Sequence, residues 1–168
     1  QKVRLNLQTS ERQNRVDFSF TEPYFLNRDV SFRTDAYTTV TQFRESNYDN
    51  ERDGFGFGLG YNVGEYGRQR LGYKLEKRNV VAYSGASSSV IAEAGENILS
   101  LFDITNVYDT TDNSMNPTDG WYTSNTLSLA GVGGDKRYIK VFAKASNFHK
   151  IYNDKVVSSA TGKAGYVL

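Results

Sequence analysis

The sequence predicts an all-β protein, folded as an antiparallel up-and-down sheet. Three observations support this fold class. Polar and apolar residues alternate with a period of two rather than 3.6, as in strands with two unlike faces. Turn-forming residues separate the alternating segments. The predicted strands are also long, at about 7–13 residues against about 5–6 for an average soluble strand.

Nine strands are expected. In chain order they cover residues 2–8, 15–21, 30–41, 54–61, 70–76, 99–109, 121–130, 138–148 and 156–168. Alternation is strictest in the first, second, fourth and fifth segments. In residues 54–61, glycine alternates with Phe55, Phe57, Leu59 and Tyr61. The last segment is the least regular, with Ala160, Ala164 and Tyr166 opposite Thr161 and Lys163.

The predicted connections differ in length. Residues 26–29, 62–67, 116–120 and 131–135 are expected to form short turns, because they are rich in Gly, Asn, Asp and Pro. Residues 43–53 predict a longer polar loop, and 80–98 predict the longest. Within the latter, residues 87–94 can form one or two helical turns closed by Gly95. In a meander, these two longer loops lie at the same end of the sheet.

Composition excludes several classes of protein. The 168 residues carry a formal net charge of +1, so no basic excess points to nucleic acid. No run approaches the roughly 18 apolar residues of a membrane helix. Cysteine is absent, which excludes disulfides and Cys-based metal sites. The opening residues Gln1, Lys2, Val3 and Arg4 do not resemble a signal peptide, so we expect a mature or truncated segment.

The alternation leaves open which face lies inside. A soluble barrel or sandwich buries its apolar face, whereas a transmembrane barrel turns that face to lipid and encloses its polar face. Long strands favour the membrane barrel, as do mid-strand charges of both signs, which we expect to pair across a wet lumen. These charges are Arg4, Asp17, Arg33, Asp35, Lys74, Glu76, Lys140 and Lys144. Aromatic residues near strand ends, suited to interfacial girdles, are Tyr24, Phe25, Tyr66, Trp121, Tyr122, Tyr138 and Tyr152.

The residues with chemical potential are few. His149 is the sole histidine and is expected to be an interfacial side chain. Asp109, Asp112 and Asp119 cluster near a turn, and their spacing fits turn chemistry better than a Ca²⁺ site. The glycine-rich residues 131–136 lack the ending of a phosphate loop. We therefore expect no enzyme, catalytic residue, metal or cofactor.

Two segments carry a family resemblance. Residues 17–29, Asp-Phe-Ser-Phe-Thr-Glu-Pro-Tyr-Phe-Leu-Asn-Arg-Asp, resemble a signature of the BamA family, the outer-membrane-protein assembly factors of Gram-negative bacteria. Residues 116–121, Asn-Pro-Thr-Asp-Gly-Trp, are similar to a turn of the same family. The signature positions are Phe20, Thr21, Glu22, Pro23, Tyr24 and Phe25, followed by Pro117, Thr118, Asp119 and Gly120. Weaker similarity at 3–9, 130–135 and 138–141 keeps the family's order.

The resemblance implies a sixteen-stranded antiparallel transmembrane β-barrel in the outer membrane, of which residues 1–168 form the third to eleventh strands as one partial barrel domain. Residues 26–29, 62–67 and 116–120 would face the periplasm, with 43–53 and 80–98 outside the cell. Arg33, Asp35, Lys74, Glu76, Lys140 and Lys144 would face the lumen, mutually paired or touching a plug loop supplied by the rest of the protein.

The implied function is to help nascent barrel proteins fold and insert. The implied partners are outer-membrane lipid, the remaining barrel with its periplasmic POTRA repeats, accessory lipoproteins and nascent barrel proteins, but not nucleic acid. Neither the POTRA repeats nor the family's Arg-Gly-Phe loop has a counterpart here, so we expect the chain to be part of a longer polypeptide. A passive outer-membrane pore and a soluble ligand-binding β-barrel are the alternatives.

Overall fold

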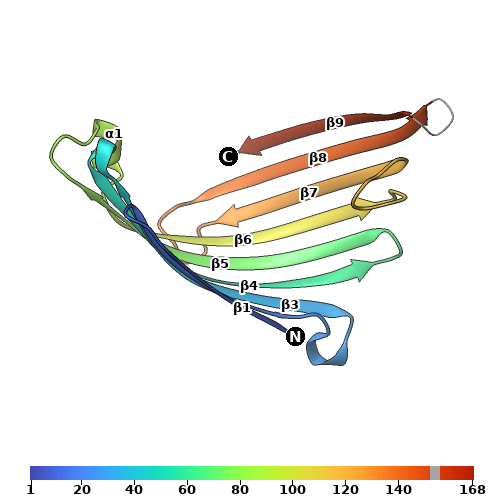
Figure 1. Ribbon diagram of the computed structural model, residues 1–168, viewed down its shortest axis with the longest axis horizontal. Coiled ribbons are helices and arrows are strands. Elements are labelled where there is room, and N and C mark those ends of the chain that lie inside the picture. Colours follow the sequence, from blue (N-terminus) through green and yellow to red (C-terminus); the bar gives the residue numbers. More distant parts are fainter. Residues whose placement is uncertain (152–155) are drawn as a thin grey trace.

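The computed structural model describes residues 1–151 and 156–168, which form one antiparallel sheet (Figure 1). Its strands follow each other in space in the order of the sequence, so the predicted up-and-down topology is confirmed. The strands are β1 (Lys2–Thr9), β2 (Gln13–Glu22), β3 (Val30–Phe43), β4 (Tyr48–Val63), β5 (Gly67–Ala82), β6 (Gly95–Asp109), β7 (Gly120–Ala130), β8 (Tyr138–Ile151) and β9 (Val156–Val167).

The sheet curves strongly but does not close on itself (Figure 1). Each inner strand pairs with two neighbours, whereas β1 pairs only with β2 and β9 only with β8. Alternate connections gather at the same end, as an up-and-down meander requires. The connections after β1, β3, β5 and β7 lie at the end that carries the short helix α1 (Ser88–Ala92), and those after β2, β4 and β6 lie at the opposite end.

The predicted loop at residues 43–53 is wrong. The β3–β4 connection is residues 44–47 alone, containing the 3₁₀ turn η2 (Arg44–Ser46), and β4 begins at Tyr48. The charged residues at 51–53 interrupt the alternation of polar and apolar residues, so the sequence pattern does not indicate a strand there. In the structure, however, Asp53 lies directly opposite Lys77 of β5. Lys77 in turn forms an ion pair with Glu96 of β6, at 2.7 Å between Nζ and Oε1. Polar residues occupy both faces here, which removes the alternation. The backbone pairing nevertheless continues.

The other connections agree more closely with the prediction. Residues 83–94 join β5 to β6 and include α1, whose N-terminus is capped by the Ser87 side chain. Three residues join β4 to β5, with Gly64 at φ 69°. The predicted 116–120 turn falls at the end of a longer connection, residues 110–119, and its last residue, Gly120, begins β7. The glycine-rich segment lies along the edge of β6, where Asp135 exchanges hydrogen bonds with Ile98 at 2.7 and 2.6 Å.

The described residues hold almost no apolar core. Val80 is the one buried hydrophobic residue in that part of the chain, at 8% exposure. Large apolar side chains are instead open, among them Leu5 at 63%, Phe55 at 51% and Phe57 at 45%. In the same described part, no helix has the length and apolar character needed to cross a membrane.

Candidate functional site

The register divides the strand side chains into two faces. The face that carries Arg33 and Lys74 is called the wet face here, and the face that carries Phe55 and Phe57 is called the apolar face. Side chains of β3 and β5 meet above β4 on the wet face, as expected on the concave side of the sheet. The apolar face then lies on the convex side, where an exposed band of Leu, Val and Phe is suited to lipid rather than water.

Charge is distributed unequally between the two faces. The wet face of the described strands carries thirteen basic side chains and five acidic ones. The basic residues are Lys2, Arg4, Arg15, Arg33, Arg52, Arg68, Arg70, Lys74, Arg78, Lys140, Lys144, Lys150 and Lys163, and the acidic ones are Asp17, Asp35, Glu76, Asp103 and Asp109. The apolar face carries only six charged residues, which are Glu22, Asp49, Glu51, Asp53, Lys77 and Glu96 among the described strands.

The predicted wet-face charges behave in two ways. Arg33 and Asp35 form a close ion pair, with 2.7 Å between a guanidinium nitrogen and Oδ1, and Lys74 pairs with Glu76 at 2.7 Å. Both pairs join residues two apart on the same strand, so the expected pairing across a lumen is not what is seen in this part of the chain. Lys140 and Lys144 have no carboxylate within 4.0 Å among the described residues.

Glu76 is the centre of a buried polar cluster. Its side chain is 4% exposed and contacts Lys74 and Arg78, with Arg78 at 3.1 Å. The hydroxyl of Tyr37 on β3 donates a hydrogen bond to the same carboxylate across the intervening strand. The Tyr37 ring lies over Gly54, where the Cβ of any larger residue would overlap the ring. The sequence pattern assigns Tyr37 to the polar face but gives no sign of this contact, which depends on a glycine in the neighbouring strand.

A groove follows the glycines of β4. It encloses about 510 Å³ above Gly56, Gly58 and Gly60, and Gly72 of β5 extends its floor. Arg33 and Arg70 stand at its margins. Because these glycines alternate with large apolar residues, the sequence predicts that they lie on the polar face and either leave space there or let the wall bend. The groove provides the predicted open space along the wet face.

The first signature segment forms the turn between β2 and β3. Phe20 lies on the apolar face, Thr21 lies opposite Arg33 on the wet face, and Glu22 accepts a hydrogen bond from the Tyr24 amide at 3.3 Å. Pro23 and Tyr24 lead into the 3₁₀ turn η1 (Phe25–Asn27). Leu26 adopts φ 55°, which is uncommon for a branched residue, and its side chain is 76% exposed.

Phe25 anchors this turn to the apolar face. Its ring stacks on Phe32 of β3, with 4.9 Å between ring centroids. The prediction that Phe25 lies at the border of the apolar band is consistent with this contact. The family motif therefore holds a turn of unusual backbone conformation against the sheet.

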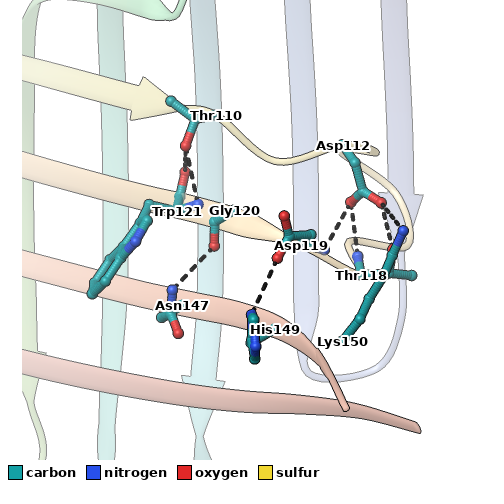
Figure 2. A network of polar contacts seen from close by, with 9 residues as sticks. All are labelled: Thr110, Asp112, Thr118, Asp119, Gly120, Trp121, Asn147, His149 and Lys150. Carbon is teal, nitrogen blue, oxygen red and sulfur yellow. Dashed lines mark hydrogen bonds and ion pairs between the residues drawn. The ribbon is translucent and has the colours of Figure 1, made fainter. Parts of the chain in front are cut away.

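The second signature segment closes the β6–β7 connection (Figure 2). Asp112 accepts hydrogen bonds from the Thr118 hydroxyl and from the amides of Thr118 and Asp119, the latter two at 2.8 and 3.1 Å. These bonds hold the pKa of Asp112 well below its usual value. Pro117 precedes Thr118, and Gly120 has φ 110° with Thr110 packed too closely to admit a side chain.

Two acidic residues of this connection contact basic side chains of β8. The Asp119 carboxylate lies 3.5 Å from His149 Nδ1, and the Asp112 carboxylate lies 3.9 Å from Lys150 Nζ (Figure 2). Within the described residues, no group of three or more His, Cys, Asp or Glu side chains is arranged to hold a metal ion. The hydrogen bonds of Asp112 agree with the turn chemistry that the sequence predicts.

The aromatic residues predicted to form a girdle lie on both faces of the sheet. Tyr66 and Tyr108 pack edge to face at 6.2 Å near the end that carries the signature turns, and Trp121 is exposed there. Tyr122 and Tyr138 lie on the wet face instead, because within their strands they share a side with Ser124 and Lys140. The Lys144 ammonium lies 5.2 Å from the centroid of the Tyr122 ring. Tyr152 lies outside the described residues.

The sequence of the chain matches one superfamily domain and two relatives of the same kind. The Omp85 superfamily domain matches residues 1–168. The outer membrane protein assembly factor BamA of Nitratidesulfovibrio vulgaris is 31% identical over 162 residues, which cover 95% of this chain and 20% of that protein. BamA of Neorickettsia risticii is 28% identical over 110 residues, covering 65% of this chain and 15% of that protein.

A solved structure shows the same fold. The crystal structure of BamA from Haemophilus ducreyi lacking POTRA domains 1–3 matches 98% of this chain and 35% of that chain, with a TM-score of 0.78 and 19% sequence identity. The chain spans about a fifth of the length of the Nitratidesulfovibrio relative.

Proposed function

The chain belongs to the Omp85 superfamily, and we propose that it is a wall segment of an outer-membrane barrel that helps nascent β-barrel proteins fold and insert into the outer membrane of a Gram-negative bacterium. The observation that carries the proposal is the family match along the whole chain. The exposed apolar face and the charged wet face support it, since they suit a wall between lipid and water.

The proposal gives the chain a mechanical role without a catalytic step. Strands paired along their backbones satisfy their polar groups within the bilayer, and the aliphatic and aromatic residues of the convex face provide contact with lipid. β1 and β9 each offer a free edge to the remainder of the barrel. The proposed partners are that remainder, POTRA repeats, accessory lipoproteins of the assembly complex, outer-membrane lipid and the nascent barrel proteins.

The test uses the full-length protein reconstituted in phospholipid vesicles. A urea-unfolded outer-membrane barrel protein is added, and its folding is followed by its shift in electrophoretic mobility without heating. We expect the reconstituted protein to accelerate folding over empty vesicles. Solute leakage is measured in parallel. Leakage without accelerated folding would favour a passive pore and contradict the proposal.

A further inference from the structure

The wet face carries a cluster of cations that the rest of the described chain does not neutralise. On β7, β8 and β9 this face has four lysines and no carboxylate among the described residues. Lys150 reaches Asp112 in the neighbouring connection, but Lys140, Lys144 and Lys163 have no acidic group within 4.0 Å in the described part. These three residues are called the lysine strip here.

The register makes this strip unfavourable when it stands alone. Lys144 and Lys163 are direct partners across β8 and β9, and they point to the same side of the sheet. Like charges that face each other across an antiparallel pair are destabilising. An anion placed between the two ammonium groups would remove the repulsion, so the arrangement is suited to binding a negatively charged group.

The position of the strip indicates which kind of anion can reach it. Lys144 and Lys163 lie near the middle of β8 (Tyr138–Ile151) and β9 (Val156–Val167), away from both ends of the sheet. Lipid phosphates lie at the two rims of a membrane barrel, whereas a polypeptide segment can extend into its lumen. On the same face, the exposed Thr161, whose hydroxyl is hydrogen-bonded to the buried Ser146, adds one polar partner for a peptide backbone.

We propose that the lysine strip binds the carboxylates of an acidic polypeptide segment that enters the lumen. Glutamate or aspartate side chains of this segment lie between Lys144 and Lys163 and beside Lys140. The concentration of positive charge on one concave face also attracts such a segment over a distance. This inference rests on the proposed barrel, in which the wet face lines the lumen, and names a class of partner for that lining.

The experiment measures peptide binding to the full-length protein in detergent micelles. The probe is a fluorescent ten-residue peptide of alternating glutamate and serine, and the comparison peptide has glutamine in place of each glutamate. We expect the acidic peptide alone to bind at low salt and its binding to weaken steeply as salt rises. The triple variant K140E/K144E/K163E should bind it at least tenfold more weakly.

Three controls make the result specific. The variant R28E/R44E/K136E makes the same change in net charge at exposed residues outside the strands, and should change affinity less than twofold. The variant K144R/K163R keeps the charge and should retain binding. The single variant K163E should lower affinity and also raise the urea midpoint of the peptide-free protein, because it removes the repulsion with Lys144.

Defined outcomes would overturn the inference. Equal binding by the wild type and K140E/K144E/K163E would do so, as would equal binding of the acidic and glutamine peptides. Tighter binding of inorganic phosphate or of anionic phospholipid vesicles at the strip would assign it to a phosphate ligand instead. The folding assay reports separately on the proposed function, so a wild-type protein that accelerates folding normally but does not bind the acidic peptide would contradict this inference alone.

Discussion

At the scale of single residues, the wet face depends on a few positions that lack a side chain. Tyr37 reaches Glu76 only because Gly54 leaves room for its ring on the strand between them. Glu76 is nearly inaccessible to solvent, and its contacts with Lys74, Arg78 and Tyr37 satisfy a charge that would otherwise be costly to bury. One glycine thus allows three strands to share a polar cluster.

Replacing Gly54 with alanine should therefore be destabilising. The new Cβ would overlap the Tyr37 ring, and overpacking of this kind costs about 1–3 kcal/mol. Gly58→Ala is the matched control, because the atom nearest its Cβ is a backbone oxygen at 3.3 Å, and its effect should be smaller. The free energy of unfolding of the full-length protein in urea measures both. Equal losses would contradict the role given to Gly54, and Y37A/G54A should recover part of the loss.

The Asp112 loop should respond to acid with a defined sign. Hydrogen bonds from Thr118 and Asp119 lower the pKa of Asp112 below its ordinary 3.8, so the ionised form stabilises the folded loop. That stabilisation is fully present above about pH 4 and is lost as the pH falls from there toward the depressed pKa.

Amide hydrogen exchange at Thr118 and Asp119 measures this effect. Their protection should be constant from pH 7 to about pH 5 and should decrease below about pH 4. D112N should show weaker protection that no longer changes over the acid range. A wild-type loop whose protection is unchanged at low pH would contradict the role of the carboxylate.

At the scale of the strand, hydrogen bonding and membrane contact end at different residues. β4 and β5 remain paired from Val63 and Gly67 as far as Tyr48 and Ala82. The apolar face, however, changes from Phe55 to Asp53 within one strand repeat, and Lys77, which lies opposite Asp53 on β5, forms an ion pair with Glu96 of β6. The paired sheet therefore extends beyond the apolar band at this end.

An arginine scan along β4 should locate this border. Phe57→Arg should lower stability in lipid by about 2–4 kcal/mol, because its side chain faces the centre of the apolar band. Glu51→Arg, on the same face but beyond the band, should cost about 0–1 kcal/mol. Heat-dependent gel mobility after refolding into vesicles measures the difference. Equal effects at both positions would contradict the assignment of the faces.

The choice of a wet-face control for this scan depends on the ion pairs. Lys74→Gln should lower stability, because Lys74 pairs with the buried carboxylate of Glu76. Lys140→Gln is the better control, since Lys140 has no carboxylate partner among the described residues. We expect K140Q to leave stability within about 0.5 kcal/mol of the wild type.

At the scale of the whole molecule, the fold separates charge and leaves two edges open. A formal net charge of +1 hides a wet face with a large excess of cations and an apolar face whose few strand charges are mostly acidic. β1 and β9 do not pair with each other, so each exposes one row of backbone groups. In lipid such groups must find partners, which the remainder of the proposed barrel would supply.

Residues 1–168 alone should consequently not form a closed monomer. We expect the isolated segment in detergent to associate through its β1 and β9 edges, giving a distribution of oligomers or aggregates. Size-exclusion chromatography with light scattering measures this distribution, and the full-length protein is the control. A single monodisperse monomer of the isolated segment would contradict the expectation.

Local sequence pattern is enough to locate most of the strands and to assign their two faces. Alternation in segments such as 2–8 and 54–61 is a local property, because neighbouring side chains on a strand always point to opposite sides. The signature residues around Pro23 and Pro117 likewise indicated turns and the family. Local pattern failed at residues 48–53, where polar surroundings on both sides of the sheet removed the alternation while the backbone remained paired.

The contacts between residues on different strands depend on the tertiary structure. The contact of Tyr37 with Glu76 over Gly54 and the opposition of Lys144 and Lys163 both follow from the register between strands. Register depends on how whole strands pair, and a shift of one residue would turn every side chain to the other face. Composition and spacing within a strand therefore specify what each face contains, while pairing between strands specifies what each residue touches.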